Sequence, residues 1–152
     1  MSLELMCRKA YECKLHIGKL DTDVKNKVLL DAADLLEQND LELSADIIVE
    51  MTKKLREIAH LSDPIGEVMS MSKRPNGLII GKRRVALGVV GVIFESQPNI
   101  ITDAFGLCIK SGNCLILKGD AETLSTNKAI VNVLQQALKM NNVPIEALNL
   151  ID

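Results

Sequence analysis

Two apolar runs without alternation, each followed by residues at helical spacing, constrain the fold of this chain most. The runs are VVGVIF at residues 89–94 and CLILK at residues 114–118. Continuous β-branched and apolar runs of this length are typical of strands buried on both faces, as in a parallel sheet. A further apolar stretch, ALNLID, begins at Ala147. From Val85 onward the sequence therefore predicts strand, helix, strand, helix, strand.

The predicted order is that of a βαβαβ unit, which is half of a doubly wound, Rossmann-like sheet. Right-handed crossovers would place both connecting helices on one face of that sheet. The first helix is predicted over residues 99–110, and Gly112 suits the left-handed residue that closes it. Asp120 is a candidate N-cap of the second helix. The usual G-x-G-x-x-G fingerprint is absent, so no ordinary pyrophosphate loop is predicted.

The part of the chain before the sheet divides into two segments. Residues 1–66 have mainly helical spacing and end in the turn LSDPIG, where Asp-Pro and Gly interrupt the periodicity. Residues 67–88 are predicted as an extended β arm, with a turn signal at RPNG and a second candidate hairpin turn at Gly81 and Lys82. The whole chain is thus predicted as α/β, with N-terminal helices, an arm, and the βαβαβ part over residues 89–152.

The polar loop ESQPN, at residues 95–99, is the first candidate functional site. Pro98 ends the preceding strand because its nitrogen cannot donate to a ladder. Ligands of open α/β sheets bind beyond the carboxyl ends of parallel strands, which is where this loop would lie. An ordinary turn is the alternative for the loop, and a helix N-cap is the alternative for Asn99.

Composition argues against several classes of partner. The formal net charge is −2 and only three residues are aromatic, so no nucleic-acid partner is expected. No apolar run reaches the ~18 residues of a membrane span. The N-terminus MSLELMCRKAYECK carries charges where a signal peptide has an apolar core. We therefore expect a cytoplasmic protein with no membrane partner.

The four cysteines have no spacing that indicates chemistry. None forms a C-x-x-C pair, and neither histidine has a metal-ligand spacing with them, so no metal site is predicted. Cys108 falls in a predicted apolar helix and Cys114 in a predicted apolar strand, where formation of a thiolate is disfavoured. Reduced structural thiols are therefore the prediction, and neither of these two is expected to be a nucleophile.

Two longer motif runs resemble one enzyme family. The runs RRVALGVVGVIFESQPN and DAFGLCIKSGNCLILKGDAETLSTNKAI are similar to those of γ-glutamyl phosphate reductases, also called glutamate-5-semialdehyde dehydrogenases, of the aldehyde dehydrogenase superfamily. LSDPIGEV and KNKVLLDAADLLEQN match the same family, so the resemblance covers nearly the whole chain. It implies an aldehyde-dehydrogenase-like fold and a reaction of proline biosynthesis, in which NADPH reduces L-glutamate 5-phosphate to L-glutamate 5-semialdehyde.

The resemblance also implies roles for individual residues. Lys118 matches a lysine or arginine along the adenosine end of the cofactor, where a cation suits the extra phosphate of NADPH. Glu122 would meet the adenosine ribose, and Glu95 and Asn99 would lie where substrate and nicotinamide meet. Asn99 is the candidate for oxyanion or substrate contact. The arm over residues 77–88 is implied to pair two copies in a homo-oligomer.

Four departures from the family pattern bear on activity. The family uses a cysteine thiolate to attack the acyl phosphate, but that cysteine lies downstream in a second, catalytic domain, and no cysteine here matches it. The region around residues 45–51 is shorter than in the family, Gln97 replaces an arginine, and Asp120 replaces a glycine. The chain is therefore interpreted as the N-terminal, NADP-binding portion of the reductase, without its catalytic domain and inactive alone. The alternatives are a non-catalytic homologue that acts as a binding or interaction module and the reductase half of a bifunctional kinase–reductase.

Overall fold

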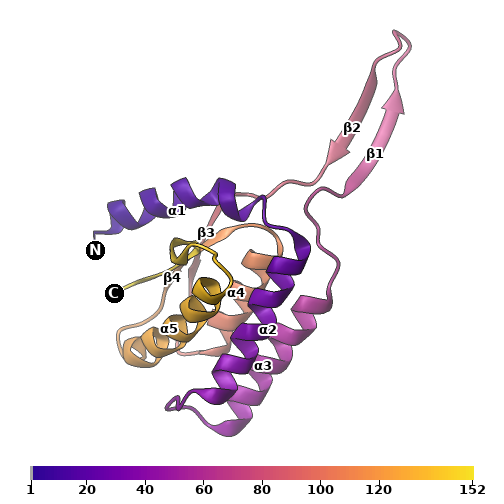
Figure 1. Cartoon of the computed structure of the whole chain (residues 1–152). Coiled ribbons are helices and arrows are strands. Elements are labelled where there is room, and N and C mark those ends of the chain that lie inside the picture. The colour runs from indigo at the N-terminus through magenta and orange to yellow at the C-terminus, as the bar shows by residue number, and fades with distance from the viewer. Residues whose placement is uncertain (1) are drawn as a thin grey trace.

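Helices and two separate sheets make up residues 2–152, the part of the chain that the structure, a computed structural model, describes (Figure 1). The elements are α1 (Leu3–Ile17), α2 (Thr22–Gln38), α3 (Ala45–His60), β1 (Val68–Lys73), β2 (Ile79–Arg83), β3 (Val89–Ile93), α4 (Asn99–Lys110), β4 (Cys114–Lys118), α5 (Leu124–Met140), the 3-10 turn η1 (Ile145–Ala147) and β5 (Leu148–Ile151). The predicted α/β class is confirmed, including the order βαβαβ from β3 to β5.

The larger sheet has the order β3-β4-β5, and both pairs of neighbouring strands are parallel, as the apolar runs predicted. Cys114 at the start of β4 faces α1, since its thiol is hydrogen-bonded to that of Cys13. Side chains alternate along a strand, so Leu115 and Leu117 point to the other face, where α4 and α5 lie (Figure 1). Both leucines are fully buried. The two crossover helices therefore share one face of the sheet.

Three further helices complete the packing around the sheet. α2 and α3 pack on each other and cover the outer side of α4 and α5, so that α4 is enclosed between the sheet and a second helical layer (Figure 1). Gly106 of α4 permits the approach of α3, because a Cβ there would lie 2.8 Å from Ile58 Cδ1. α1 lies across the amino-terminal ends of the strands, with Lys9 Nζ 3.9 Å from Glu146 Oε1. Between residues 2 and 152, no helix has the length and apolarity needed to cross a membrane.

The burial predicted for β3 is wrong. β4 is buried on both faces, as expected, but Ile93 of β3 is 86% exposed and Gly91 is also exposed. β3 is an edge strand within residues 2–152, where β4 is its one partner. The apolar composition of β3 is that of a central strand, with a partner strand on each side. Within residues 2–152, β3 has a partner on one side, and this leaves its other edge uncovered.

The arm is an antiparallel hairpin that projects away from the helices and the parallel sheet (Figure 1). Its turn lies at the RPNG signal: the N–H of Arg74 donates to the carbonyl of Leu78 at 2.7 Å, and Gly77 has φ +88°. The alternative turn at Gly81 and Lys82 is wrong, because both residues pair with β1 inside β2. The sequence Pro-Asn-Gly favours a tight turn, because the glycine readily adopts the left-handed conformation that the turn needs. Gly81 and Lys82, within a run of strand residues, lack such a signal.

The predicted turn LSDPIG is held by a buried ion pair. Asp63 accepts hydrogen bonds from Lys25 Nζ at 2.8 Å, from Thr22 Oγ1 at 2.9 Å and from the N–H of Ile65 at 2.9 Å. The Lys25 side chain is fully buried. Burial raises the pKa of Asp63, but the bonds from Lys25, Ile65 and Thr22 outweigh it and hold the pKa below its usual range.

Candidate functional site

The candidate residues gather at the carboxyl-terminal edge of β3 and β4. Ile93 and Lys118 are partners in the parallel register, and the N–H of Phe94 donates to the carbonyl of Lys118 at 3.0 Å. Glu95 follows β3 directly, and Asn99 opens α4 three residues after Ser96. The two loops that leave these strands therefore lie next to each other. This edge is where open α/β sheets bind their ligands.

Asn99 carries an unmet hydrogen-bonding group. Its Oδ1 is buried and has no hydrogen-bond partner. The N-cap interpretation is wrong, because α4 begins at Asn99, Pro98 occupies the cap position, and no side chain caps this helix. An unsatisfied buried acceptor costs about 1–3 kcal/mol, and a ligand, ion or water that paired with it would remove that cost. The Oδ1 of Asn99 is therefore an acceptor that lacks a donor, and a ligand N–H or O–H group could supply one. An oxyanion, which itself accepts, would instead have to meet the Nδ2 amide of Asn99.

A carboxylate joins the two loops. Asp120 Oδ2 accepts from the N–H of Ser96 at 3.0 Å and from Ser96 Oγ at 2.6 Å, while its Oδ1 accepts from the N–H and Oγ1 of Thr123. The hydrogen bonds from Ser96 and then from Thr123 lower the pKa of Asp120 to about 2. Asp120 thus caps the turn that precedes α5 rather than α5 itself, which begins at Leu124. Sequence reasoning missed the bond to Ser96.

Gly119 lies at a close approach between β4 and its neighbours. A Cβ on Gly119 would lie 2.5 Å from Asn127 Nδ2 and 3.1 Å from Phe94 Cζ. Asn127 is buried in the first turns of α5, and its amide donates to Thr123 Oγ1 at 3.0 Å. The sequence could have revealed Asn127, because it is a polar residue at a position that the helical pattern predicts to be buried. These contacts hold the backbone between Lys118 and Asp120 in place.

Three charged candidates differ in their surroundings. Lys118 is half-buried, and its Nζ donates to the carbonyl of Asp152 at 2.9 Å. Glu95 and Glu122 are exposed on the loops that follow β3 and β4. Together with Asp120 these residues are three carboxylates and one ammonium group, and the ion pair between Lys128 and Asp152 lies beside Lys118. Of the four residues, Lys118 is the one that attracts an anionic ligand, so the phosphates of such a ligand are expected to lie on the Lys118 side.

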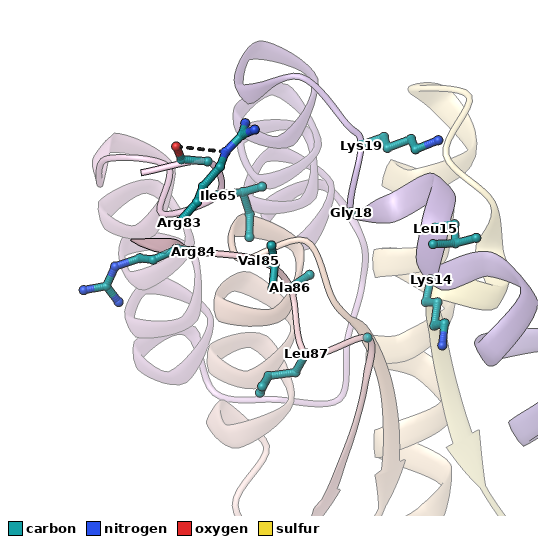
Figure 2. A pocket seen from close by; sticks show the side chains of 12 residues that line it. Lys14, Leu15, Gly18, Lys19, Ile65, Arg83, Arg84, Val85, Ala86 and Leu87 are labelled. Atoms are coloured by element: carbon teal, nitrogen blue, oxygen red, sulfur yellow. Dashed lines mark hydrogen bonds between the residues drawn. The ribbon is translucent and has the colours of Figure 1, made fainter. Parts of the chain in front are cut away.

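A cavity of about 360 Å³ lies on the opposite, amino-terminal side of the sheet, at the base of the arm (Figure 2). Its lining includes four cations, Lys14, Lys19, Arg83 and Arg84, and three of them have partners within the chain. Lys14 Nζ lies 3.3 Å from the centre of the Tyr11 ring, Arg83 Nε donates to the carbonyl of Gly66, and Arg84 pairs with Glu67. Figure 2 shows Arg84 pointing out of the cavity. The cavity therefore lies away from the candidate site, and Lys19 is the one cation of its lining without a side-chain partner among residues 2–152.

Cys108 and Cys114 are unsuited to nucleophilic chemistry where they lie. Burial raises the pKa of the Cys108 thiol to about 11. The hydrogen bond with Cys13 and burial raise the pKa of Cys114 far above its usual range. Cys114 lies at the amino end of β4, away from Asn99. Neither thiol is therefore expected to be a nucleophile.

Comparison with known proteins identifies the family. The sequence profile of the aldehyde dehydrogenase family matches residues 2–152. The chain belongs to the aldehyde dehydrogenase family. Among the relatives, a γ-glutamyl phosphate reductase from Agathobacter rectalis is 53% identical over 176 residues, covering 99% of this chain and 42% of the relative. Another γ-glutamyl phosphate reductase, from Carboxydothermus hydrogenoformans, is 37% identical and covers 96% of this chain and 41% of the relative.

Solved structures of aldehyde dehydrogenase family members share this fold. The γ-glutamyl phosphate reductase of Thermotoga maritima superposes with a TM-score of 0.93 at 29% identity, covering 99% of this chain and 43% of that one. The glyceraldehyde-3-phosphate dehydrogenase GapN of Methanocaldococcus jannaschii, complexed with NADP, has a TM-score of 0.73 at 19% identity, with 97% and 35% coverage. The recognised resemblance and the aldehyde-dehydrogenase-like fold are confirmed.

The chain spans about two fifths of the length of the curated relatives it matches. The match to the Agathobacter rectalis protein extends over 176 residues, more than the 152 of this chain, so the relative carries residues that this chain lacks. This agrees with the expected shortening relative to the family. Its assignment to residues 45–51 stays a prediction.

Proposed function

We propose that this chain is the cofactor-binding portion of an enzyme that reduces L-glutamate 5-phosphate to L-glutamate 5-semialdehyde with NADPH. The observation that carries the proposal is the buried, unpaired Oδ1 of Asn99 at the carboxyl edge of the parallel sheet. The relatives at 53% and 37% identity are both named γ-glutamyl phosphate reductase, which supports L-glutamate 5-phosphate as the substrate. The division into residues 1–66, 67–88 and 89–152 stays a prediction.

The residues of this edge fit a phosphorylated nicotinamide dinucleotide. Lys118 offers a cation to the phosphate on the adenosine ribose, and the exposed Glu122 can accept from a ribose hydroxyl. Asn99 and Glu95 lie on the loop after β3, which we assign to the nicotinamide end. NADPH supplies the hydride when bound. The task of this chain is then to hold and orient the cofactor, because no cysteine here matches the family nucleophile.

Two residues favour the alternative of a non-catalytic binding module. Gln97 cannot clamp a carboxylate or phosphate through two parallel bonds as an arginine does. Asp120 adds a fixed negative charge beside the loops, since the hydrogen bonds from Ser96 and Thr123 lower its pKa to about 2. A homologue that has lost the cofactor site and acts as an interaction module would not bind NADPH.

A titration of the purified chain with NADPH, followed by nicotinamide fluorescence, tests the proposal. We expect saturable binding in the range of roughly 1 μM to 1 mM that is typical of such enzymes. Addition of L-glutamate 5-semialdehyde, phosphate and NADP should give no change in nicotinamide absorbance. Absence of saturable binding favours the binding-module alternative, and turnover by this chain would refute its assignment as an inactive portion.

We also propose that the arm pairs two copies of the protein. The arm carries large apolar side chains that are more than half exposed, namely Val68, Met69, Met71, Leu78 and Ile79. Within residues 2–152 each strand of the hairpin pairs with the other alone, which leaves an outer edge open to another chain.

Replacing apolar residues of the arm is expected to shift the oligomeric state. Met71→Lys with Ile79→Lys should convert a dimer or larger species to monomer in sedimentation velocity, because charged side chains on an edge oppose strand pairing. The exposed Val49→Lys on α3 is the control and should leave the sedimentation coefficient unchanged. A monomeric unaltered chain at high concentration would refute this proposal.

A further inference from the structure

All four acceptor positions of one carboxylate are used inside the chain. Each oxygen of Asp120 accepts two hydrogen bonds, Oδ2 from Ser96 and Oδ1 from Thr123, at 2.6 to 3.1 Å. An ionised carboxylate offers about four lone-pair sites, so none is left for a ligand hydroxyl. Asp120 therefore acts on its own chain. It ties the loop after β3 to the turn before α5 across 24 residues of sequence.

The residue that Asp120 holds has an unusual backbone. Ser96 has φ +42°, in the left-handed region that residues with a Cβ seldom adopt. Such a conformation costs conformational energy and persists where neighbouring contacts determine it. Two hydrogen bonds to Asp120, from the N–H and from Oγ, are those contacts. Without them Ser96 is expected to leave this conformation.

The position of Ser96 affects Asn99 through a short, stiff connection. Gln97 and Pro98 alone separate the two residues, and the proline ring fixes one of the intervening torsions. The carbonyls of Gln97 and Pro98 accept from Ile100 and Ile101 in the first turn of α4. A change at Ser96 is therefore carried to the start of α4, where the unpaired Oδ1 of Asn99 lies.

We propose that Asp120 is a positioning residue, which acts through Ser96 to hold residues 95–99 so that Asn99 meets the nicotinamide end of the cofactor. This inference rests on the proposed function. It differs from a purely electrostatic role, in which the carboxylate would repel the phosphates of the cofactor. Removing the charge of Asp120 should weaken NADPH binding if Asp120 positions the loop, and should strengthen it if Asp120 repels the phosphates.

Two variants separate these roles. Ser96→Ala removes the 2.6 Å hydrogen bond and leaves the charge of Asp120 in place. Asp120→Asn removes the charge and places an amide where one carboxylate oxygen accepted from Ser96 or Thr123. We expect each variant to weaken NADPH binding about tenfold, the loss of one hydrogen bond to a charged group. The double variant should be no weaker than either single one, because both break the same contact.

Two further measurements report on positioning rather than on general folding. Adenosine 2′,5′-bisphosphate lacks the nicotinamide, so Ser96→Ala should bind it within about twofold of the unaltered chain. Amide hydrogen exchange without ligand should be faster at Ser96, Ile100 and Ile101 in both variants and unchanged in β4. A structural defect would instead weaken both ligands and loosen β4.

The outcomes separate this inference from the proposed function. Tighter NADPH binding by Asp120→Asn with no effect of Ser96→Ala overturns the inference in favour of repulsion. Unchanged exchange at Ser96, Ile100 and Ile101 in both variants also overturns it. If the unaltered chain binds neither NADPH nor the bisphosphate, the proposed function fails, and with it the claim about the nicotinamide. The exchange data then decide whether Asp120 orders the loop.

Discussion

Asp63→Asn should lower the free energy of unfolding by about 3–5 kcal/mol, the usual cost of removing one partner of a buried ion pair. The ammonium group of Lys25 is fully buried and lies 2.8 Å from Asp63 Oδ2. Asparagine keeps the shape but removes the charge, so Lys25 would be left without a counter-charge. Urea unfolding followed by circular dichroism measures the change.

Two further variants test the reason for this loss. Asp34→Asn removes an exposed partner of Arg56, which keeps its contact with Glu37, and should change stability by less than about 1 kcal/mol. Lys25→Met in the Asp63→Asn background should recover part of the loss, because it removes the uncompensated charge. A loss below about 1 kcal/mol in Asp63→Asn, or no recovery in the double variant, would contradict this account.

The same ion pair predicts a dependence on pH. Hydrogen bonds from Lys25, Ile65 and Thr22 lower the pKa of Asp63 in the folded chain, despite the opposing effect of burial. A carboxyl of the unfolded chain has a pKa of about 3.9. The stabilisation by Asp63 is therefore fully present above that value and is lost as the pH falls through the lower pKa of the folded chain. The difference between Asp63→Asn and the unaltered chain should shrink accordingly in acid.

Lys118→Gln should weaken NADPH binding about 10- to 100-fold, which corresponds to the loss of a charge-assisted bond to a phosphate. Lys118 is half-buried at the carboxyl end of β4, where its Nζ reaches the carbonyl of Asp152 at 2.9 Å. NADH lacks the phosphate on the adenosine ribose, so its affinity should change by less than about threefold. Parallel titrations with the two nucleotides measure the ratio.

A control of equal charge makes the result specific to Lys118. Lys139→Gln removes one positive charge at the last turn of α5, near its far end, and should leave both affinities unchanged. Added salt should reduce the difference between NADPH and NADH in the unaltered chain, because it screens the phosphate–ammonium attraction. An equal loss of affinity for NADPH and for NADH in Lys118→Gln would show that Lys118 does not bind the phosphate on the adenosine ribose.

Elements with a strong local pattern could be predicted from the sequence. The continuous apolar run of β4 matches its burial on both faces, and Gly112 closes α4 with φ +72°. These features depend on residues within a few positions of each other, so composition and spacing determine them. The β3 run has the same composition, yet Ile93 is 86% exposed, because burial depends on which segments cover a strand.

The candidate site could likewise be predicted only where it depends on local sequence. The sequence predicted a polar loop at the carboxyl end of β3 and a charged end of β4, and the parallel register brings them to one edge. The bond between Ser96 and Asp120 could not be predicted, since it joins residues 24 positions apart and needs the strand register to be known. The unpaired Oδ1 of Asn99 likewise depends on what surrounds it.

The sequence by itself determined the α/β class, the order of the strands and helices, and the family to which the chain belongs. Tertiary structure alone decided that β3 is an edge strand, that Oδ1 of Asn99 is left unpaired, and that Asp120 holds Ser96. The first group follows from backbone preferences and from periodic burial, which are local. The second depends on packing and hydrogen bonds between distant segments, whose partners exist only once the chain has folded.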